Sequence, residues 1–188
     1  KKISEGNAIG WMQGKMEFGP RSLGSRSILA DPRIKDMQKK LNLKIKYRES
    51  FRPFAPSIVE EDLKDWFDLD IASPYMLLVD KVNSQKLFSS NNKKYGIDKL
   101  NEIRSAVPAI THVDNSARIQ TVNRKTNSRY YDLISKFKEL TSCSLLINTS
   151  FNVRGEPIVC NVEDAFKCFM GTELDVLVIE DYILYKSD

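Results

Sequence analysis

Arginines near the start of the chain are the residues best suited to chemistry. Five of the ten arginines fall within residues 1–56, mostly in or beside stretches with glycine and proline. A guanidinium keeps its charge when partly buried, and its planar fork binds phosphate oxygens in pairs. We therefore predict a pocket for a di- or triphosphate, with a solvated basic surface as the alternative. The predicted lining is Arg21, Arg26, Lys46, Arg48 and Arg52.

A second set of polar side chains follows a short apolar run. Residues 144–147 read as a buried strand, and the loop after it holds Ser150 and Asn152, which would point the same way in an extended segment. Both could donate hydrogen bonds to phosphate oxygens or a ribose, although a single Ser or Asn more often completes its own turn. Arg118 is either a further phosphate ligand or an ion-pair partner of the acidic half of the chain.

The charge of the chain is uneven. Residues 1–56 carry 13 Lys and Arg against 5 Asp and Glu, a net +8, whereas residues 57–188 carry 16 against 20, a net −4. A basic first part favours an anionic partner such as phosphate, a nucleotide or a nucleic acid. A basic RNA-binding module would interleave aromatic stacking platforms with these charges. Phe51 and Phe54 read as core anchors instead, so nucleic acid is the less favoured partner.

Composition argues against several other classes. Three cysteines form no CxxC pair and His112 is the only histidine, so we expect no protein-bound metal and a structural role for this imidazole. No apolar run approaches the roughly 20 residues that span a bilayer. The start lacks both a signal peptide and an initial Met, so we expect a cytoplasmic protein and a chain excised from a longer one.

The elements that must position these residues mix strands and helices without regular βαβ alternation. This predicts one α/β domain with a mixed sheet. Residues 81–99 are polar and without period, and we expect a mobile surface insertion there. Lys46 and Arg48 are expected on one face of an extended segment. The predicted strands are 8–12, 27–30, 57–59, 75–79, 106–110, 119–122, 144–147, 176–179 and 182–185. The predicted helices are 31–42, capped by Asp31, 60–67, 130–140 and 161–170, capped by Asn161.

Four motifs carry a resemblance that covers nearly the whole chain. They begin with FGPRSLGSRSILADPR at residues 18–33 and RESFRPFAP at 48–56, and continue with HVDNSAR at 112–118 and NTSFNVRGEP at 148–157. Together they resemble the C-terminal domain of the NodU/CmcH/TobZ-type O-carbamoyltransferases. Within them, Lys46-Tyr47-Arg48 and Ser150-Phe151-Asn152 are similar to the KxR…SxN pattern of YrdC-like domains. One departure is Asn115, where the family usually has glycine.

The resemblance implies a YrdC-like, twisted open mixed sheet flanked by helices, spanning residues 1–188. It implies that ATP, accompanied by Mg²⁺, and carbamoyl phosphate react on its basic concave face to give carbamoyl adenylate. An N-terminal domain of actin-like ATPase fold, absent from this chain, then passes the carbamoyl group to an acceptor hydroxyl. A related threonylcarbamoyl adenylate synthase is the alternative enzyme, against which the FGPR and FRPFAP motifs argue.

The resemblance also implies roles for single residues. Cations and donors fixed around the reacting phosphate should supply most of the catalysis. The expected catalytic residues are Lys46, Arg48 and Arg52. The expected substrate- and nucleotide-binding residues are Arg21, Arg26, Arg118, Ser150, Asn152 and Arg154.

Overall fold

The computed structural model describes residues 1–89, 100 and 102–186. The strands of this part form one sheet of eight, in the order β4-β5-β3-β6-β2-β1-β7-β8. Pairs β1–β7 and β3–β5 are parallel and the others antiparallel, which confirms the predicted mixed sheet. In chain order the strands are β1 (Ile9–Met12), β2 (Arg26–Ala30), β3 (Ala55–Val59), β4 (Leu78–Lys81), β5 (Ser116–Val122), β6 (Leu145–Ser150), β7 (Val176–Ile179) and β8 (Tyr182–Tyr185).

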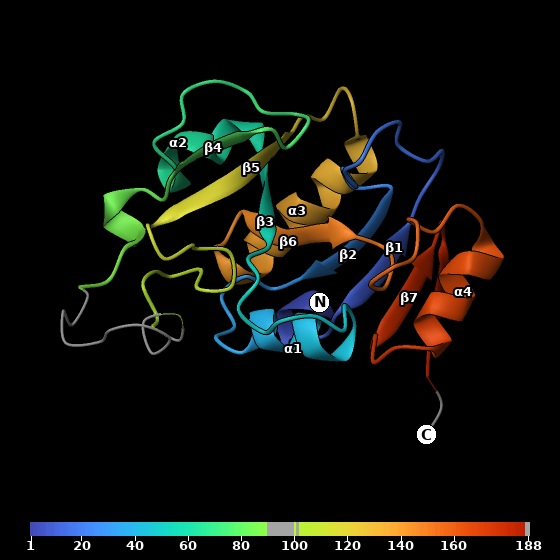
Figure 1. The fold of residues 1–188 in the computed structure, drawn as a ribbon. Coiled ribbons are helices and arrows are strands. Elements are labelled where there is room, and N and C mark those ends of the chain that lie inside the picture. The colour runs from blue at the N-terminus through green and yellow to red at the C-terminus, as the bar shows by residue number, and fades with distance from the viewer. Residues whose placement is uncertain (90–99, 101, 187–188) are drawn as a thin grey trace.

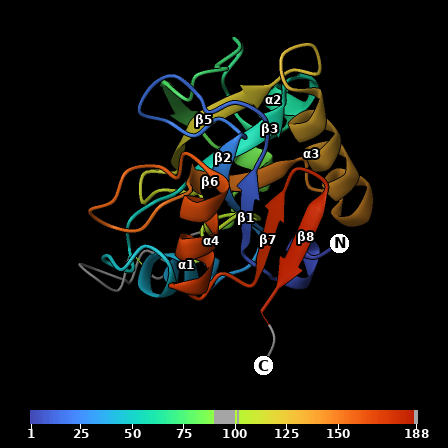
Figure 2. The same cartoon turned by 90° about the vertical axis from the view of Figure 1, so that its right-hand side faces the viewer.

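Helices cover both faces of this sheet. Figures 1 and 2 show α3 against one face, and α1 and α4 against the other. No helix in the described residues is long and apolar enough to cross a membrane. The helices are α1 (Met37–Lys44), α2 (Leu63–Trp66), α3 (Ser128–Thr141) and α4 (Val162–Met170), with 3₁₀ turns η1 (Ile3–Glu5), η2 (Glu60–Asp62) and η3 (Ser84–Lys86).

The packing of α3 and α4 follows from their sequences. Tyr130, Ile134 and Phe137 repeat at helical spacing and are buried against the sheet, as the apolar stripe predicts. The side chain of Asn161 accepts from the backbone N–H of Asp164, whose carboxylate accepts from the backbone of Asn161. This capping box confirms the predicted start of α4.

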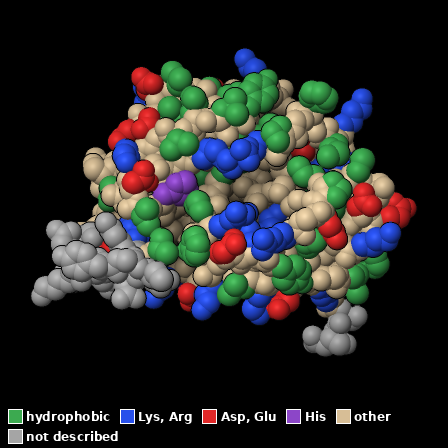
Figure 3. Space-filling view, viewed as in Figure 1, with side chains coloured by type: hydrophobic (Ala, Val, Ile, Leu, Met, Phe, Trp, Pro, Cys, Tyr) green, Lys and Arg blue, Asp and Glu red, His purple; other side chains and the backbone are tan. Residues whose placement is uncertain are grey.

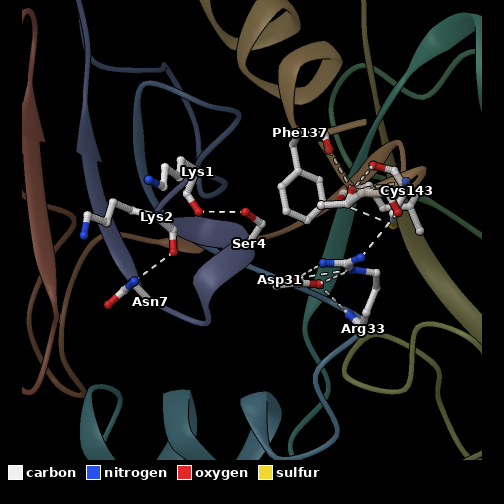
Figure 4. Close-up of polar contacts among 10 residues, drawn as sticks. Lys1, Lys2, Ser4, Asn7, Asp31, Arg33, Phe137 and Cys143 are labelled. Atoms are coloured by element: carbon white, nitrogen blue, oxygen red, sulfur yellow. Dashed lines mark hydrogen bonds and ion pairs between the residues drawn. The ribbon is translucent and has the colours of Figure 1, made fainter. Parts of the chain in front are cut away.

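The predicted helix start at Asp31 is wrong, because α1 begins only at Met37. The fully buried Asp31 carboxylate instead accepts from the backbone N–H of Arg33 at 2.9 Å and from its guanidinium at 2.6 Å. Figure 4 shows this pair beside Phe137 and Cys143. The first turn of the chain lies at the left of the same view. A side chain that closes a local ring with its own neighbour is not free to cap a helix.

Two predicted strands are also corrected. Residues 75–77 precede β4 and expose Tyr75 and Leu77, so this apolar run is not a buried strand. Residues 106–110 form a turn, anchored by the buried Val107 and Ile110. In both places the domain buries single side chains rather than an alternating set. The local pattern of apolar residues does not reveal which side chains are buried.

The expected insertion at 81–99 is only partly described. Residues 81–89 end β4 and form η3, where Val82 is buried and the Lys86 ammonium lies 4.5 Å from the ring of Trp66. This part therefore contacts the domain, and its mobility stays a prediction. Residues 90–99 lie outside the described residues.

Candidate functional site

A small pocket lies where β3 begins, β6 ends and β5 passes alongside. Its volume is about 130 Å³, below the roughly 300–1,000 Å³ of pockets that bury a whole small-molecule ligand. None of the described residues that line it is an Asp or Glu. Figure 3 shows Lys and Arg side chains gathered around a hollow in this face. The lining comprises Pro20, Arg21, Ser22, Arg48, Pro53, Phe54, Ala55, Met76, Arg118, Asn148, Thr149 and Ser150.

Arg118 lies on one wall of the pocket and projects from β5. Its side chain is partly buried, and its Nε is buried without a hydrogen-bond partner in the described residues. Nη2 lies 4.0 Å from Sδ of Met76. Burial and the charge of Arg21 both lower the pKa of Arg118. Two guanidiniums thus repel each other beside one pocket, and an anion between them would relieve the repulsion.

Arg21 reaches the pocket from a loop that is pinned at its base. Oε1 of Glu17 accepts the backbone N–H groups of Leu23 at 2.8 Å and Ser25 at 2.6 Å. Gly24 has φ +112°, and a Cβ there would come within 2.3 Å of the ring of Tyr130. Glycine is therefore required for the loop to turn against α3 and present Arg21.

Arg48 borders the pocket from the segment between α1 and β3. Its Nε donates to Oδ1 of Asn42 at 2.6 Å, and its guanidinium lies 4.9 Å from the ring of the buried Phe54. Burial and the nearby Arg52 lower its pKa. An amide and an aromatic face therefore orient this charge without neutralising it.

The position of Lys46 relative to Arg48 differs from the predicted one. Tyr47 has φ +48°, so the segment is not extended and Lys46 does not share a face with Arg48, contrary to expectation. The Lys46 ammonium is buried and donates to the carbonyl and hydroxyl oxygens of Ser150. It also donates to Oδ1 of Asn152 at 2.7 Å and to its carbonyl oxygen at 3.0 Å. Lys46 thereby clamps the loop after β6.

The two donors of that loop bond each other. The Ser150 hydroxyl donates to Oδ1 of Asn152 at 2.8 Å, and Nδ2 of Asn152 donates to the Glu156 carbonyl. Ser150 lines the pocket, whereas Asn152 is not among the lining residues. The KxR and SxN segments, about a hundred residues apart, do meet, but through the lysine clamp.

Three further predicted residues are not brought to the pocket. Arg26 is only 4% exposed and its guanidinium donates to the carbonyls of Gln13, Ser25 and Cys160. Arg52 is exposed and pairs with Glu49 at 3.3 Å. Arg154 is exposed as well.

Glu49 lies at the surface near Arg48, Arg52 and Arg154. A hydrogen bond from its own backbone lowers its pKa, and so do the charges of Arg52, Arg154 and Arg48. Nearby Phe51 is 54% exposed, so its predicted role as a core anchor is wrong, whereas Phe54 is buried as predicted.

Asn148 is a lining residue that the sequence singled out only as part of a motif. Its Nδ2 donates to the Ser22 carbonyl and to Oε1 of Gln120, and so ties β6 to the Arg21 loop and to β5. An amide inside an otherwise apolar strand was the available signal.

His112 borders a separate cavity of about 560 Å³, and burial lowers its pKa. Among the described residues no group of three or more His, Cys, Asp and Glu side chains could hold a metal ion.

The sequence of this chain matches a known protein family. The family described as "Carbamoyltransferase C-terminus" matches residues 1–186. An uncharacterized protein of Synechocystis is 59% identical over 188 residues, which are 98% of this chain and 31% of that protein. Nodulation protein NolO of Bradyrhizobium diazoefficiens is 45% identical over 98% of this chain and 31% of its own length. The 3'-hydroxymethylcephem-O-carbamoyltransferase of Streptomyces clavuligerus is 33% identical over 95% of this chain and 30% of its own length.

Two solved structures share the fold. Sua5 of P. abyssi, as an H234A/Y235A variant, aligns with a TM-score of 0.54 at 12% identity, covering 98% of this chain and 50% of its own. Full-length HypF, in a phosphate- and nucleotide-bound form, aligns with a TM-score of 0.53 at 16% identity, covering 95% and 20%. The expected YrdC-like fold is confirmed. The chain spans about a third of the length of the relatives it matches, and it belongs to the family of carbamoyltransferase C-terminal domains.

Proposed function

We propose that this domain binds ATP and carbamoyl phosphate at the arginine pocket and forms carbamoyl adenylate. The observation that carries the proposal is the convergence of Arg21, Arg48 and Arg118 on a pocket whose described lining includes no carboxylate. Cations held without counter-charges favour a multiply charged anion. The pocket is too small for a whole nucleotide, so the adenosine of ATP extends outside it.

The proposed reaction balances in two steps. Water first cleaves carbamoyl phosphate into carbamate and phosphate. A carbamate oxygen then attacks the α-phosphorus of ATP, and the bond from that phosphorus to the bridging oxygen breaks, so that pyrophosphate leaves with Mg²⁺. Negative charge concentrates on the phosphate oxygens in this step, where fixed guanidiniums stabilise it.

Each residue has a part in this proposal. Arg21 and Arg48 hold the α-phosphate, and Arg118 contacts both that phosphate and the oxygen of the carbamoyl group. Lys46 keeps the loop of Ser150 and Asn152 in place, so that the Ser150 hydroxyl faces the substrates. At the surface, Arg52 and Arg154 contact the outer phosphates. Arg26 supports the pocket through the backbone carbonyls that it binds.

The acceptor and its domain lie beyond this chain in the proposal. We propose that an N-terminal domain of the same polypeptide, with an actin-like ATPase fold, takes the carbamoyl group from the adenylate to a hydroxyl. The name of the Streptomyces relative, an O-carbamoyltransferase acting on a hydroxymethyl group, supports such an acceptor. The proposed setting is the cytoplasm, where ATP is available.

Binding and pyrophosphate release together test the proposal. Calorimetry should detect ATP with Mg²⁺ and, separately, carbamoyl phosphate. Arg118→Ala should weaken both by about tenfold or more, since a charge-assisted hydrogen bond is lost. Arg124→Ala is the matched control, because Arg124 is exposed, pairs with Asp132 and lies beyond the opposite end of β5. Failure of the wild-type chain to bind either ligand at millimolar concentration would contradict the proposal. Pyrophosphate release that needs both substrates would support its chemical step.

A further inference from the structure

The side-chain amide of Asn148 is only half used by the protein. Its Nδ2 donates to the Ser22 carbonyl at 3.0 Å and to Oε1 of Gln120 at 2.7 Å. Its Oδ1 is buried and accepts no hydrogen bond from any residue that the structure describes. Asn148 is 1% exposed and borders the arginine pocket. Buried acceptors are nearly always paired, so an unpaired one beside a binding pocket points to a donor on the ligand.

The orientation of this amide is fixed by its neighbours. Nε2 of Gln120 donates to the Leu23 carbonyl at 2.8 Å, and a carbonyl can only accept. Oε1 of Gln120 therefore faces the other way, where it accepts from the Ser57 hydroxyl at 2.5 Å and from Asn148. Since the Ser22 carbonyl also requires a donor, Asn148 cannot exchange its oxygen and nitrogen without losing two hydrogen bonds.

Strand register places this acceptor in line with a donor. Asn148 pairs with Ala55 across β6 and β3. Ala55 and Arg118 each stand two residues before the paired Ser57 and Gln120, so their side chains share the face of Asn148. The three residues form a row across neighbouring strands, with backbones of the outer two roughly 10 Å apart.

This row combines two unsatisfied polar atoms with a small side chain between them. Nε of Arg118 is a buried donor without a partner in the described residues, and Oδ1 of Asn148 is a buried acceptor without one. The methyl group of Ala55 leaves the space between them open to a small group. A ligand group that satisfies both must carry an acceptor and an N–H or O–H donor.

We propose that the Arg118–Ala55–Asn148 row is the subsite for the carbamoyl group and that Asn148 determines its selection. The inference rests on the proposed function and deepens it. The NH₂ of the carbamoyl group donates to Oδ1 of Asn148, and its oxygen accepts from Arg118. An acetyl group has the same shape but offers a methyl where the donor is required, so the site rejects it. Inorganic phosphate also binds the arginines, and its protonated oxygen is an O–H donor that Asn148 can accept, so it reports anion binding and not selection.

Ligand comparison on the unmodified chain tests this without any risk to folding. Calorimetry would measure the dissociation constants of carbamoyl phosphate, acetyl phosphate and inorganic phosphate. Carbamoyl phosphate should bind about ten- to a hundredfold more tightly than acetyl phosphate, because the latter leaves a buried acceptor unsatisfied. In Asn148→Ala this ratio should fall close to one. Asn123→Ala is the control, an amide that bonds Glu60 at the far end of β5, and should keep the wild-type ratio.

The outcomes separate the two proposals. One outcome is that inorganic phosphate binds and that carbamoyl phosphate and acetyl phosphate bind with the same affinity as each other. This would overturn the role of Asn148 and leave the adenylation site standing. An unchanged ratio in a folded Asn148→Ala variant, with phosphate binding retained, would do the same. Failure of the wild type to bind any of the three anions would overturn both.

Discussion

Replacing Lys46 with methionine should remove a pH dependence from the stability of this domain. The Lys46 ammonium is buried among oxygens of Ser150 and Asn152, and none of its described partners is a carboxylate. Burial, with a smaller effect of Arg48, lowers its pKa from 10.5 to about 7. Between these two values the unfolded chain binds a proton that the folded chain has released.

The sign and size of the effect follow from proton linkage. Stability rises with pH wherever the unfolded state binds more protons, by up to about 1.4 kcal/mol per pH unit for one proton. With a folded pKa of about 7, the Lys46 contribution should grow by about 2 kcal/mol between pH 7 and 9. Below pH 7 both states hold the proton, so the contribution is constant and least favourable there.

Urea unfolding at several pH values measures this directly. The buried Trp11 and Trp66 report unfolding by fluorescence. The difference in unfolding free energy between wild type and Lys46→Met should become larger from pH 7 to 9. Lys44→Met is the control, because its exposed ammonium pairs with Glu173, which raises the Lys44 pKa and keeps it charged in this range. Parallel profiles for wild type and Lys46→Met would show that the surrounding oxygens hold the charge, and would refute the burial argument.

Three other substitutions test the surroundings of the pocket. Glu49→Gln should strengthen sulfate binding about two- to fivefold in calorimetry, because Glu49 competes with the anion for Arg52; weaker binding would contradict this. Gly24→Ala should lower the unfolding free energy by about 2 kcal/mol, since its Cβ would overlap the Tyr130 ring, and an unchanged denaturation midpoint would show that the loop adapts. Asn161→Ala should cost about 1 kcal/mol in the same assay through loss of the capping box, without affecting anion affinity.

The fold was accessible from sequence where a local rule and the tertiary structure agree. The apolar run at 144–147 lies in β6, and the cap at Asn161 starts α4. The capping rule failed at Asp31. The proline after Asp31 suggested a helix start, but the Asp31 carboxylate accepts hydrogen bonds from Arg33. The rule that an apolar run forms a buried strand failed at residues 75–79. Such a run is buried only where another surface covers it, and the structure leaves Leu77 exposed.

The site was accessible only as a set of residues, without their directions. Charge and spacing placed Arg21 and Arg48 in one hypothesis, the resemblance added Arg118, and the structure brings the three to one pocket. The same reasoning could not separate them from Arg26, five residues after Arg21, because backbone carbonyls from distant segments decide where that guanidinium points. Asn148 escaped the predicted set since its unpaired oxygen becomes visible only after Gln120 and Ser22 have fixed its nitrogen.

The predicted cations differ in where their N–H donors point, and this separates those that support the fold from those that could bind a ligand. Arg26 and Lys46 are the most deeply buried of the predicted cations, and both direct their donors at oxygens of the protein itself. Removing either would leave carbonyls unsatisfied and loosen the loops around the pocket. Arg118 keeps a buried donor without a described partner, and burial together with the charge of Arg21 lowers its pKa, so it gains most from an incoming anion. Arg118 therefore costs the empty fold stability, and ligand binding should raise the stability of the wild type more than that of Arg118→Ala.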